Sequence, residues 1–329
     1  MNPLILVLII AAALVLLVLL ISYLCFRMAF YSPDSDRPTP DEIRLPEGSI
    51  YVPYHDRMRQ WALEKRALPQ RHVTITSHDG LKLWASFFEF APGAPVELMF
   101  HGYRGTAERD LSGGVQRCFS LGRSVLLVDQ RTASRSEGRV ISFGINESRD
   151  CAAWVDWLIR DQGEDVKIIL TGISMGASTV MMAAGRPLPT QVVGVIADCG
   201  FTSAREIMGK VMADMHLPPK IFWPFVKLGA RLYGRFDPEA DSAIAAMGRC
   251  TLPVFFIHGE DDRFVPWDMT RRCYEACRGP KYFFSVPGAG HGMGYLMDTD
   301  GYRRALTKFS RENNIPIENY WEKGENDHV

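Results

Sequence analysis

The chain has 329 residues, of which 37 are Lys or Arg and 38 are Asp or Glu, and 47% of its residues are hydrophobic. This balance is typical of a globular protein, because a disordered chain has fewer apolar residues and a larger net charge. The formal net charge of -1 also disfavours nucleic-acid binding, which usually requires a basic surplus.

Seven cysteines are spread along the chain, an odd number without the dense spacing of a disulfide-stapled secreted domain. The closest pair, Cys273 and Cys277, has C-x3-C spacing, and no second pair completes a zinc ribbon. The cysteines therefore favour a reducing compartment, and no structural metal is expected.

The first 26 residues form an apolar segment that can cross a membrane. Within residues 4–24 only Ser22 and Tyr23 are not aliphatic, and no charge precedes Arg27. At 1.5 Å per residue this helix reaches about 31 Å, which matches a hydrocarbon core of about 30 Å. A cleaved signal peptide is the alternative, but no basic residue precedes the run and no A-x-A site follows it. We predict that residues 1–26 are a single-pass transmembrane anchor.

The segment after the anchor carries charges and prolines. Arg27, Arg37 and Arg44 follow the apolar run, and the positive-inside rule then places the large domain on the cytosolic side. Residues 27–69 have little apolar periodicity and several prolines, which predicts a juxtamembrane tether.

The folded domain, residues 70–313, is predicted to open with a β-hairpin. Residues 72–76 and 81–87 have strand composition and are joined by Asp79-Gly80, a pair typical of hairpin turns. Short apolar runs typical of buried strands follow at 96–100, 125–128, 166–170, 192–197, 254–257 and 282–286. Helix-length stretches separate most of them, so we predict an α/β fold with a mostly parallel sheet and helices on both faces.

One interval breaks this rhythm. Between the fourth and fifth of these runs the chain is far longer than a crossover helix requires, which predicts a helical lid insertion at about 201–249. Its apolar side chains could either pack the lid on the domain or line an acyl-binding groove; they include Met212, Met215, Phe222, Trp223, Phe225 and Leu228. Residues 314–329 are expected to be a polar C-terminal tail.

Residues 172–176, Gly-Ile-Ser-Met-Gly, form a G-x-S-x-G motif between a predicted strand and a predicted helix. In that setting the serine lies at a sharp turn with its hydroxyl exposed, and the two glycines let helix and strand approach closely. We predict that Ser174 is a nucleophile. An ordinary glycine-rich turn is the alternative.

A serine nucleophile needs a general base, usually histidine. If the base follows the nucleophile along the chain, four histidines qualify. His216 lies in the insertion, His258 ends a strand before an acidic cluster, and His328 lies in the tail. His291 remains, in a glycine-rich loop after the last predicted strand, and it is the expected base rather than a polar loop residue.

The acid that orients this base should end a strand between the serine and the histidine. Four carboxylates satisfy this condition: Asp198, Glu260, Asp261 and Asp262. Spacing alone does not choose among them.

The oxyanion of a tetrahedral intermediate requires two backbone N–H donors. One is expected from Met175, directly after the nucleophile, and the other from the loop 101–105 after the third predicted strand. Gly102 permits close approach of the backbone, so the amide of Tyr103 is the expected second donor. His101 is expected to brace this loop.

With these residues assembled, the chain resembles the α/β-hydrolase family over roughly residues 70–310. The stretch 129–138, which begins Asp-Gln-Arg, is similar to a family motif after the fourth strand, although Ser134 replaces the family glycine. Residues 198–203, Asp-Cys-Gly-Phe-Thr-Ser, are similar to the membrane-anchored and prolyl-oligopeptidase-like branch. In that branch the acid stands three residues before a Val-Pro pair, which implies Asp262 and leaves Asp198 structural, bonding local backbone amides.

The resemblance implies a cofactor-free serine hydrolase, similar to carboxylesterases and lipases, that cleaves a small-molecule ester or acyl substrate. Ser174, Asp262 and His291 would act through an acyl-enzyme intermediate. No dinucleotide loop, P-loop or zinc-protease motif points to a cofactor. Two alternatives stay open: a peptidase or amidase of the same fold, and a catalytically silent membrane-bound interaction module.

Overall fold

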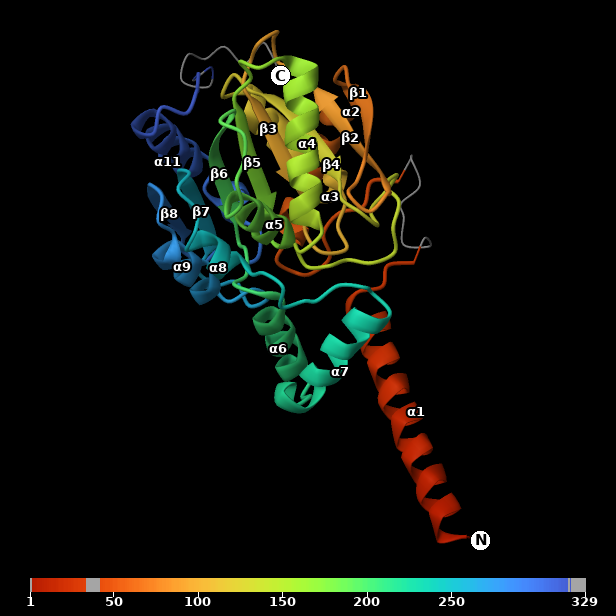
Figure 1. The fold of residues 1–329 in the computed structure, drawn as a ribbon. Coiled ribbons are helices and arrows are strands. Elements are labelled where there is room, and N and C mark those ends of the chain that lie inside the picture. Colours follow the sequence, from red (N-terminus) through yellow and green to blue (C-terminus); the bar gives the residue numbers. More distant parts are fainter. Residues whose placement is uncertain (1, 34–41, 319, 321–329) are drawn as a thin grey trace.

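The computed structural model describes residues 2–33, 42–318 and 320, which include an eight-stranded sheet with helices on both faces (Figure 1). The strands are β1 (Arg71–Thr76), β2 (Lys82–Phe88), β3 (Val96–Phe100), β4 (Ser124–Asp129), β5 (Ile168–Ile173), β6 (Val192–Asp198), β7 (Val254–Gly259) and β8 (Lys281–Val286). Their order is β1-β2-β4-β3-β5-β6-β7-β8. The first three are antiparallel and the rest are parallel, which confirms the predicted fold and its opening hairpin.

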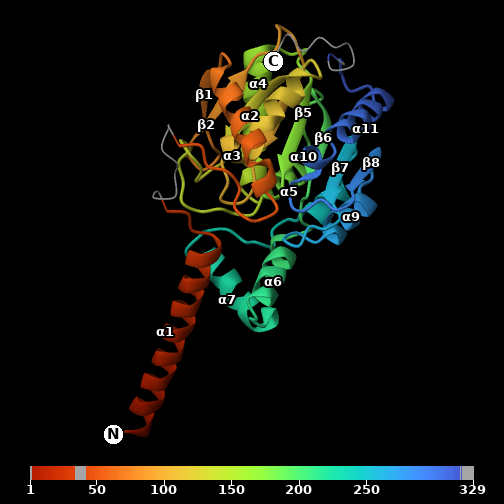
Figure 2. The same cartoon turned by 180° about the vertical axis from the view of Figure 1, so that it is seen from behind.

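Several helices cover both faces of this sheet. The helices of the described residues are α1 (Pro3–Ala29), η2 (Val52–Tyr54), α2 (His55–Ala67), α3 (Ala107–Phe119), α4 (Glu147–Gln162), α5 (Met175–Ala184), α6 (Ala204–Asp214), α7 (Pro219–Leu232), α8 (Ala243–Met247), α9 (Trp267–Ala276), α10 (Gly294–Met297) and α11 (Thr299–Glu312). Helices α4, α5, α8 and α9 lie on one face, and α3 and α11 lie on the other with α2 outside α3 (Figures 1 and 2). The strands between these layers are buried on both sides, which explains their continuous apolar runs.

A buried ion cluster lies inside the sheet. Glu97 of β3 is fully buried and accepts hydrogen bonds from Arg117, from Arg123 at 2.7 Å and from Thr171 at 3.0 Å. Burial alone would raise the pKa of Glu97, but the two guanidinium groups lower it to about 2. The carboxylate is therefore charged and fully paired in the folded chain.

We expect Glu97→Gln to lower the free energy of unfolding by about 3–5 kcal/mol at neutral pH, because it leaves two buried arginines without their anion. The native contribution is present above the unfolded pKa of Glu and is lost as the pH falls toward about 2. Urea unfolding in detergent at several pH values measures both effects. The exposed Glu89→Gln is the control, and an equal loss in both variants would contradict the expected role of the cluster.

The N-terminal helix is long and apolar enough to cross a membrane, a property that a signal sequence shares. Its last turn packs into the domain, because Phe26 and Phe30 are buried and the amide of Ile141 donates to the carbonyl oxygen of Phe30 at 2.8 Å. Tyr31 then pairs with Val140 in an isolated antiparallel bridge. The end of α1 is thus part of the hydrophobic core.

The range predicted as a tether, residues 27–69, contains folded elements. Helix α2 packs against α3, and Lys65 and Arg66 form ion pairs with Glu108 of that helix. Residues 34–41 of this range lie outside the described residues. Of the predicted tail, residue 315 is buried and the amide of residue 320 donates to the domain at Ser120, whereas 319 and 321–329 are not described.

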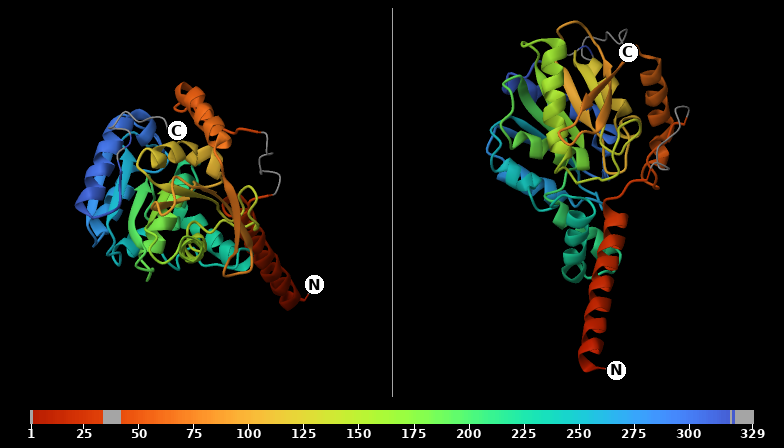
Figure 3. Two further views of the ribbon diagram at one scale, coloured as in Figure 1. Left: turned by 90° about the horizontal axis from the view of Figure 1, so that it is seen from above. Right: turned by 45° about the vertical axis from the view of Figure 1, so that its right-hand side comes forward.

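The insertion forms α6, α7 and α8. Helix α8 packs against α5, whereas α6 and α7 project from the domain on the side where α1 leaves it (Figures 1 to 3). Met212 and Trp223 are buried in the core, whereas Met215 is exposed. Helix α7 packs along the last turns of α1. This arrangement agrees with the interpretation in which the insertion's side chains serve packing.

Candidate active site

Ser174 lies at the turn between β5 and α5, with an unusual φ of 56°. The flanking glycines make this turn sterically possible. A Cβ on Gly172 would lie 2.2 Å from the carbonyl carbon of Gly176, and a Cβ on Gly176 would lie 2.1 Å from the carbonyl oxygen of Phe100. Such strain, held by close backbone packing, is typical of a nucleophile presented on a strand-to-helix turn.

Three side chains from separate loops form a hydrogen-bonded chain at the carboxyl ends of the strands. His291 Nε2 lies 2.9 Å from Ser174 Oγ, and His291 Nδ1 lies 2.6 Å from Asp262 Oδ2. Ser174 and Asp262 are buried, and His291 is partly exposed. Serine, imidazole and carboxylate in this order can activate a hydroxyl and stabilise the imidazolium that forms.

The loop after β7 holds Asp262 as an anion. Its Oδ1 accepts 2.9 Å hydrogen bonds from the amides of Phe264 and Val265, and its Oδ2 lies 3.1 Å from His258 Nε2. Burial alone would raise its pKa, but the hydrogen bonds of His258 and His291 hold the pKa of Asp262 well below its usual range. The sequence analysis excluded His258 as the base and gave it no other role. In the structure His258 bonds the acid, Asp262.

The other carboxylates occupy different positions. Asp198, at the end of β6, accepts the amide of Ser174 through its carbonyl oxygen at 2.8 Å, and its side chain lines the cavity described below. Burial raises the pKa of Asp198 to about 7, and Asp262 contributes to this rise. Glu260 accepts the hydroxyl of Ser285, and Asp261 lies at the cavity.

The backbone next to Ser174 offers two N–H donors. The amide of Met175 opens α5, and Gly102 lies so close that a Cβ there would be 3.4 Å from Ser174 Cβ. Across the described residues, no backbone hydrogen bond of the amides of Met175 or Tyr103 is observed. Both amides therefore have no backbone partner among the described residues, a condition that an oxyanion donor must meet. His101 is buried behind the loop, where its Nε2 accepts the amide of Gln130 at 3.1 Å, as expected of a brace.

The same loop is bound to the last turn of α1. Tyr103 Oη donates to the carbonyl oxygen of Ala29 at 2.8 Å, and Arg104 donates to the carbonyl oxygens of Met28 and Tyr31 at 3.0 and 2.9 Å. The position of the expected oxyanion donor thus depends directly on the N-terminal helix.

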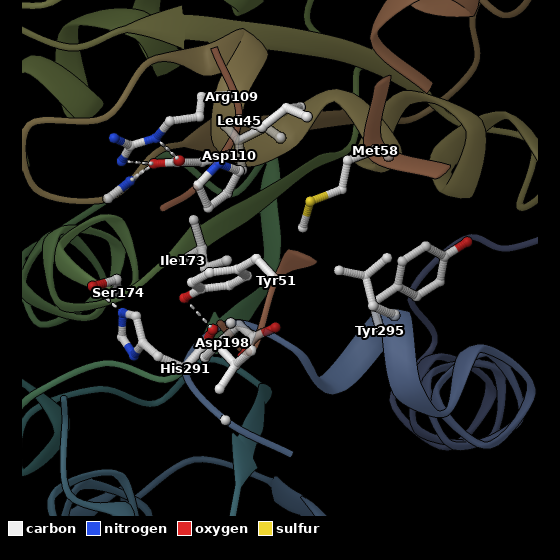
Figure 4. Close-up of a pocket in the computed structure, with 18 of the residues that line it drawn as sticks. Leu45, Tyr51, Met58, Arg109, Asp110, Ile173, Ser174, Asp198, His291 and Tyr295 are labelled. Carbon is white, nitrogen blue, oxygen red and sulfur yellow. Dashed lines mark hydrogen bonds and ion pairs between the residues drawn. The ribbon is translucent and has the colours of Figure 1, made fainter. Parts of the chain in front are cut away.

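A cavity of about 1400 Å³ opens beside Ser174 and His291 (Figure 4). Its outer wall is formed by residues 42–61, which we call the strap. Tyr51 of the strap donates to the carbonyl oxygen of His291 at 2.8 Å, and Met58 points into the cavity between Tyr51 and Tyr295 (Figure 4). No described residue of the insertion 201–249 lines this cavity.

The sequence reasoning missed the strap, although a signal for it was present. The stretch 55–67 is free of proline, contains good helix formers and is bounded by Pro53 and Pro69. The sequence reasoning did not predict this helix, α2, because the stretch is rich in charged residues and its apolar residues show little helical periodicity.

Two groups of side chains among the described residues could approach a metal ion. The first group is Cys199, Asp262 and His291, in which Asp262 and His291 already bond each other. The second is His78, Asp79 and Asp150, in which both carboxylates pair with Arg131. In both groups the carboxylates already bond other side chains, so we assign no metal to them.

With the geometry in hand, comparison with known proteins identifies the family. Residues 90–305 match the model of the alpha/beta hydrolase family. The chain belongs to this family. Among curated relatives, the chain is 31% identical to YqkD of Bacillus subtilis over 190 residues, which are 57% of this chain and 62% of YqkD, less than two thirds of its length.

Solved structures of hydrolases share the fold. The esterase Pf2001 of Pyrococcus furiosus superposes with a TM-score of 0.61 and 18% identity, covering 82% of this chain and 98% of the esterase. The acylaminoacyl peptidase of Pyrococcus horikoshii superposes with a TM-score of 0.52 and 15% identity, covering 76% of this chain and 43% of the peptidase. At these identities the likeness concerns the fold.

Proposed function

We propose that this alpha/beta hydrolase is a membrane-anchored serine hydrolase that cleaves carboxylic esters of small acyl substrates. The observation that carries the proposal is the continuous hydrogen-bonded chain Ser174–His291–Asp262. It lies at the wall of a cavity large enough for a substrate, next to two backbone amides that can hold an oxyanion.

The proposed reaction proceeds in two steps. Ser174 Oγ attacks the ester carbonyl while His291 Nε2 accepts its proton, and the amides of Met175 and Tyr103 stabilise the oxyanion. His291 then protonates the leaving alcohol, which departs and leaves an acyl-enzyme. Water, deprotonated by the same imidazole, then attacks the acyl carbonyl, and as the acid leaves His291 returns the proton to Ser174 Oγ. Asp262 stays ionised throughout and orients the imidazole.

The lining of the cavity supports an acyl substrate. Beyond the serine the cavity continues between the strap and α10, past Ile173, Met58, Trp61 and Leu296. Burial of each substrate methylene against such side chains contributes about 0.8 kcal/mol. These apolar side chains suit an ester with an aliphatic acyl chain, and charged groups that include Arg109, Asp110 and Asp198 line the same cavity.

The packing of α1 supports its proposed role as an anchor. A segment destined for removal need not contribute Phe26 and Phe30 to the core or hold the loop of Tyr103 in place. By the positive-inside rule, Arg27 and the arginines after it favour a catalytic domain on the cytosolic side.

Hydrolysis of p-nitrophenyl esters of graded chain length, beside a library of peptides and acyl-peptides, tests the proposal. We expect ester turnover with kcat/KM rising by about 10²-fold or more from C2 to C8, because added methylenes enter the cavity. Faster cleavage of peptides than of esters would contradict the ester proposal and indicate a peptidase. If neither turnover nor fluorophosphonate labelling is observed, the protein is not a serine hydrolase, and the catalytically silent interaction module is the reading that stands.

A change at Met58 tests whether the cavity is the acyl site. Met58→Trp should lower kcat/KM for the C8 ester by about tenfold and leave the C2 ester unchanged, because the indole occupies space that about two methylenes would fill. Met58→Leu, which nearly conserves volume, is the control. Equal effects of Met58→Trp on both esters would contradict this placement of the acyl chain.

A further inference from the structure

Helices α6 and α7 project away from the sheet beside α1, as Figures 1 and 2 and the right-hand view of Figure 3 show. The turn between them is the part of the insertion that lies farthest from the sheet (Figure 1). The side of the domain that carries the active site therefore has two projections, one long and apolar and one short.

Contacts between α7 and α1 locate the short projection relative to a bilayer. Gly229 lies against α1 so closely that a Cβ there would be 2.3 Å from the carbonyl oxygen of Ser22. Tyr233 Oη donates to the carbonyl oxygen of Leu19 at 3.3 Å. Leu19 stands five residues before Leu24, where the apolar run ends. At 1.5 Å per residue, this contact lies about 8 Å inside the apolar part of α1.

The same projection carries exposed apolar side chains. Met215 is 50% exposed, Ile221 62% and Leu232 49%. They lie at the turn and along α7, whose other face is buried against α1 and the core. Large apolar side chains gathered on one projecting element mark an interaction surface.

The charges of α7 and of the turn after it are all basic, whereas the tip also carries Asp214, which pairs with Lys210. Residues 219–235 contain Lys220, Lys227, Arg231 and Arg235 and no Asp or Glu. Two acids that follow in the chain, Asp237 and Glu239, pair with Arg231 and Lys227. A helix with an apolar face and basic flanks is typical of peptides that lie in a membrane interface and favour anionic lipids.

We propose that the tip of the α6–α7 hairpin, residues 211–222, inserts into the interface of the anionic bilayer that α1 crosses. The inference rests on the proposed anchoring by α1. The Leu19 contact is made by Tyr233, at the end of α7 away from the tip, and it already lies about 8 Å inside the apolar part of α1. The turn between α6 and α7 lies farthest from the sheet (Figure 1), so the tip reaches at least the depth of roughly 5–10 Å at which interfacial helices bury their apolar face. Two attachments at different points fix the tilt of the domain, so its active-site side stays at the lipid surface.

Depth-dependent fluorescence quenching of the full-length protein in vesicles tests this inference. The vesicles contain phosphatidylcholine and phosphatidylglycerol, with a quencher placed in separate preparations close to the headgroup and near the end of the acyl chain, so that both shallow and mid-bilayer labels are covered. Single cysteines at Ile221, at Leu14 in the middle of α1 and at Arg160 at the far end of α4 carry the fluorophore. Cys25 is replaced by alanine because it is only partly buried, and the other native cysteines are buried. Circular dichroism verifies that each variant is folded, independently of the proposed activity.

We expect the quencher to lower the fluorescence of the Ile221 label by about half or more, as for the Leu14 label, and to leave the Arg160 label unchanged. If the Leu14 label is quenched and the Ile221 label behaves like the Arg160 label, the hairpin does not enter the bilayer and only the anchor stands. If the Leu14 label is not quenched either, the anchor and the hairpin proposal both fail.

Discussion

Ser174→Ala is expected to lower kcat for ester hydrolysis by about 10⁴-fold or more and to abolish covalent labelling by a fluorophosphonate. Within the hydrogen-bonded set Ser174–His291–Asp262, Ser174 Oγ alone forms a covalent bond to the substrate. Alanine removes this atom but leaves the strained turn and the cavity in place. Activity measurements and gel-based detection of the probe, on protein in detergent, test both effects.

Ser49→Ala is the matched control, because Ser49 also lines the cavity but belongs to the strap. It should retain labelling and turnover. Labelling that survives in Ser174→Ala and disappears in Ser49→Ala would assign the nucleophile to the strap.

Asp262→Asn should lower kcat by about 10⁴-fold, because an amide cannot stabilise the imidazolium and holds the imidazole in the wrong tautomer. Asp198→Asn should change kcat by about tenfold or less, the effect of one altered hydrogen bond. With a pKa of about 7, Asp198 is largely neutral below that pH, so an amide resembles its native state there.

Steady-state kinetics of the two variants at pH 6 and pH 8 distinguish the two carboxylates. A loss at Asp198 as large as that at Asp262 would make Asp198 the orienting acid. A thermal melt of each variant separates a catalytic loss from unfolding, because Asp262 also bonds the amides of Phe264 and Val265.

The sheet could be predicted from the sequence because its strands are buried on both faces and therefore read as unbroken apolar runs. Ser174 could be predicted for a related reason. The backbone atoms that approach Gly172 and Gly176 exclude any Cβ, so the chemistry of the turn appears directly as a local motif. His291 followed from chain order and from its position after a strand.

The acid was a different problem. Four carboxylates stand at strand ends, and only the positions of the loops in space bring Asp262 to 2.6 Å from His291. The same is true of His258, which lies behind the acid through contacts from the loop after β7. No spacing in the chain encodes these distances.

The N-terminal part of the chain shows the limit most clearly. Sequence by itself determined that residues 4–24 are apolar enough to span a bilayer, because length and composition suffice for that property. Only the tertiary structure decided that the strap closes the cavity, that the end of α1 holds the loop of Tyr103, and that α7 lies along α1. These contacts join segments more than 70 residues apart in sequence, and they depend on shape complementarity between surfaces that exist only after the sheet has formed.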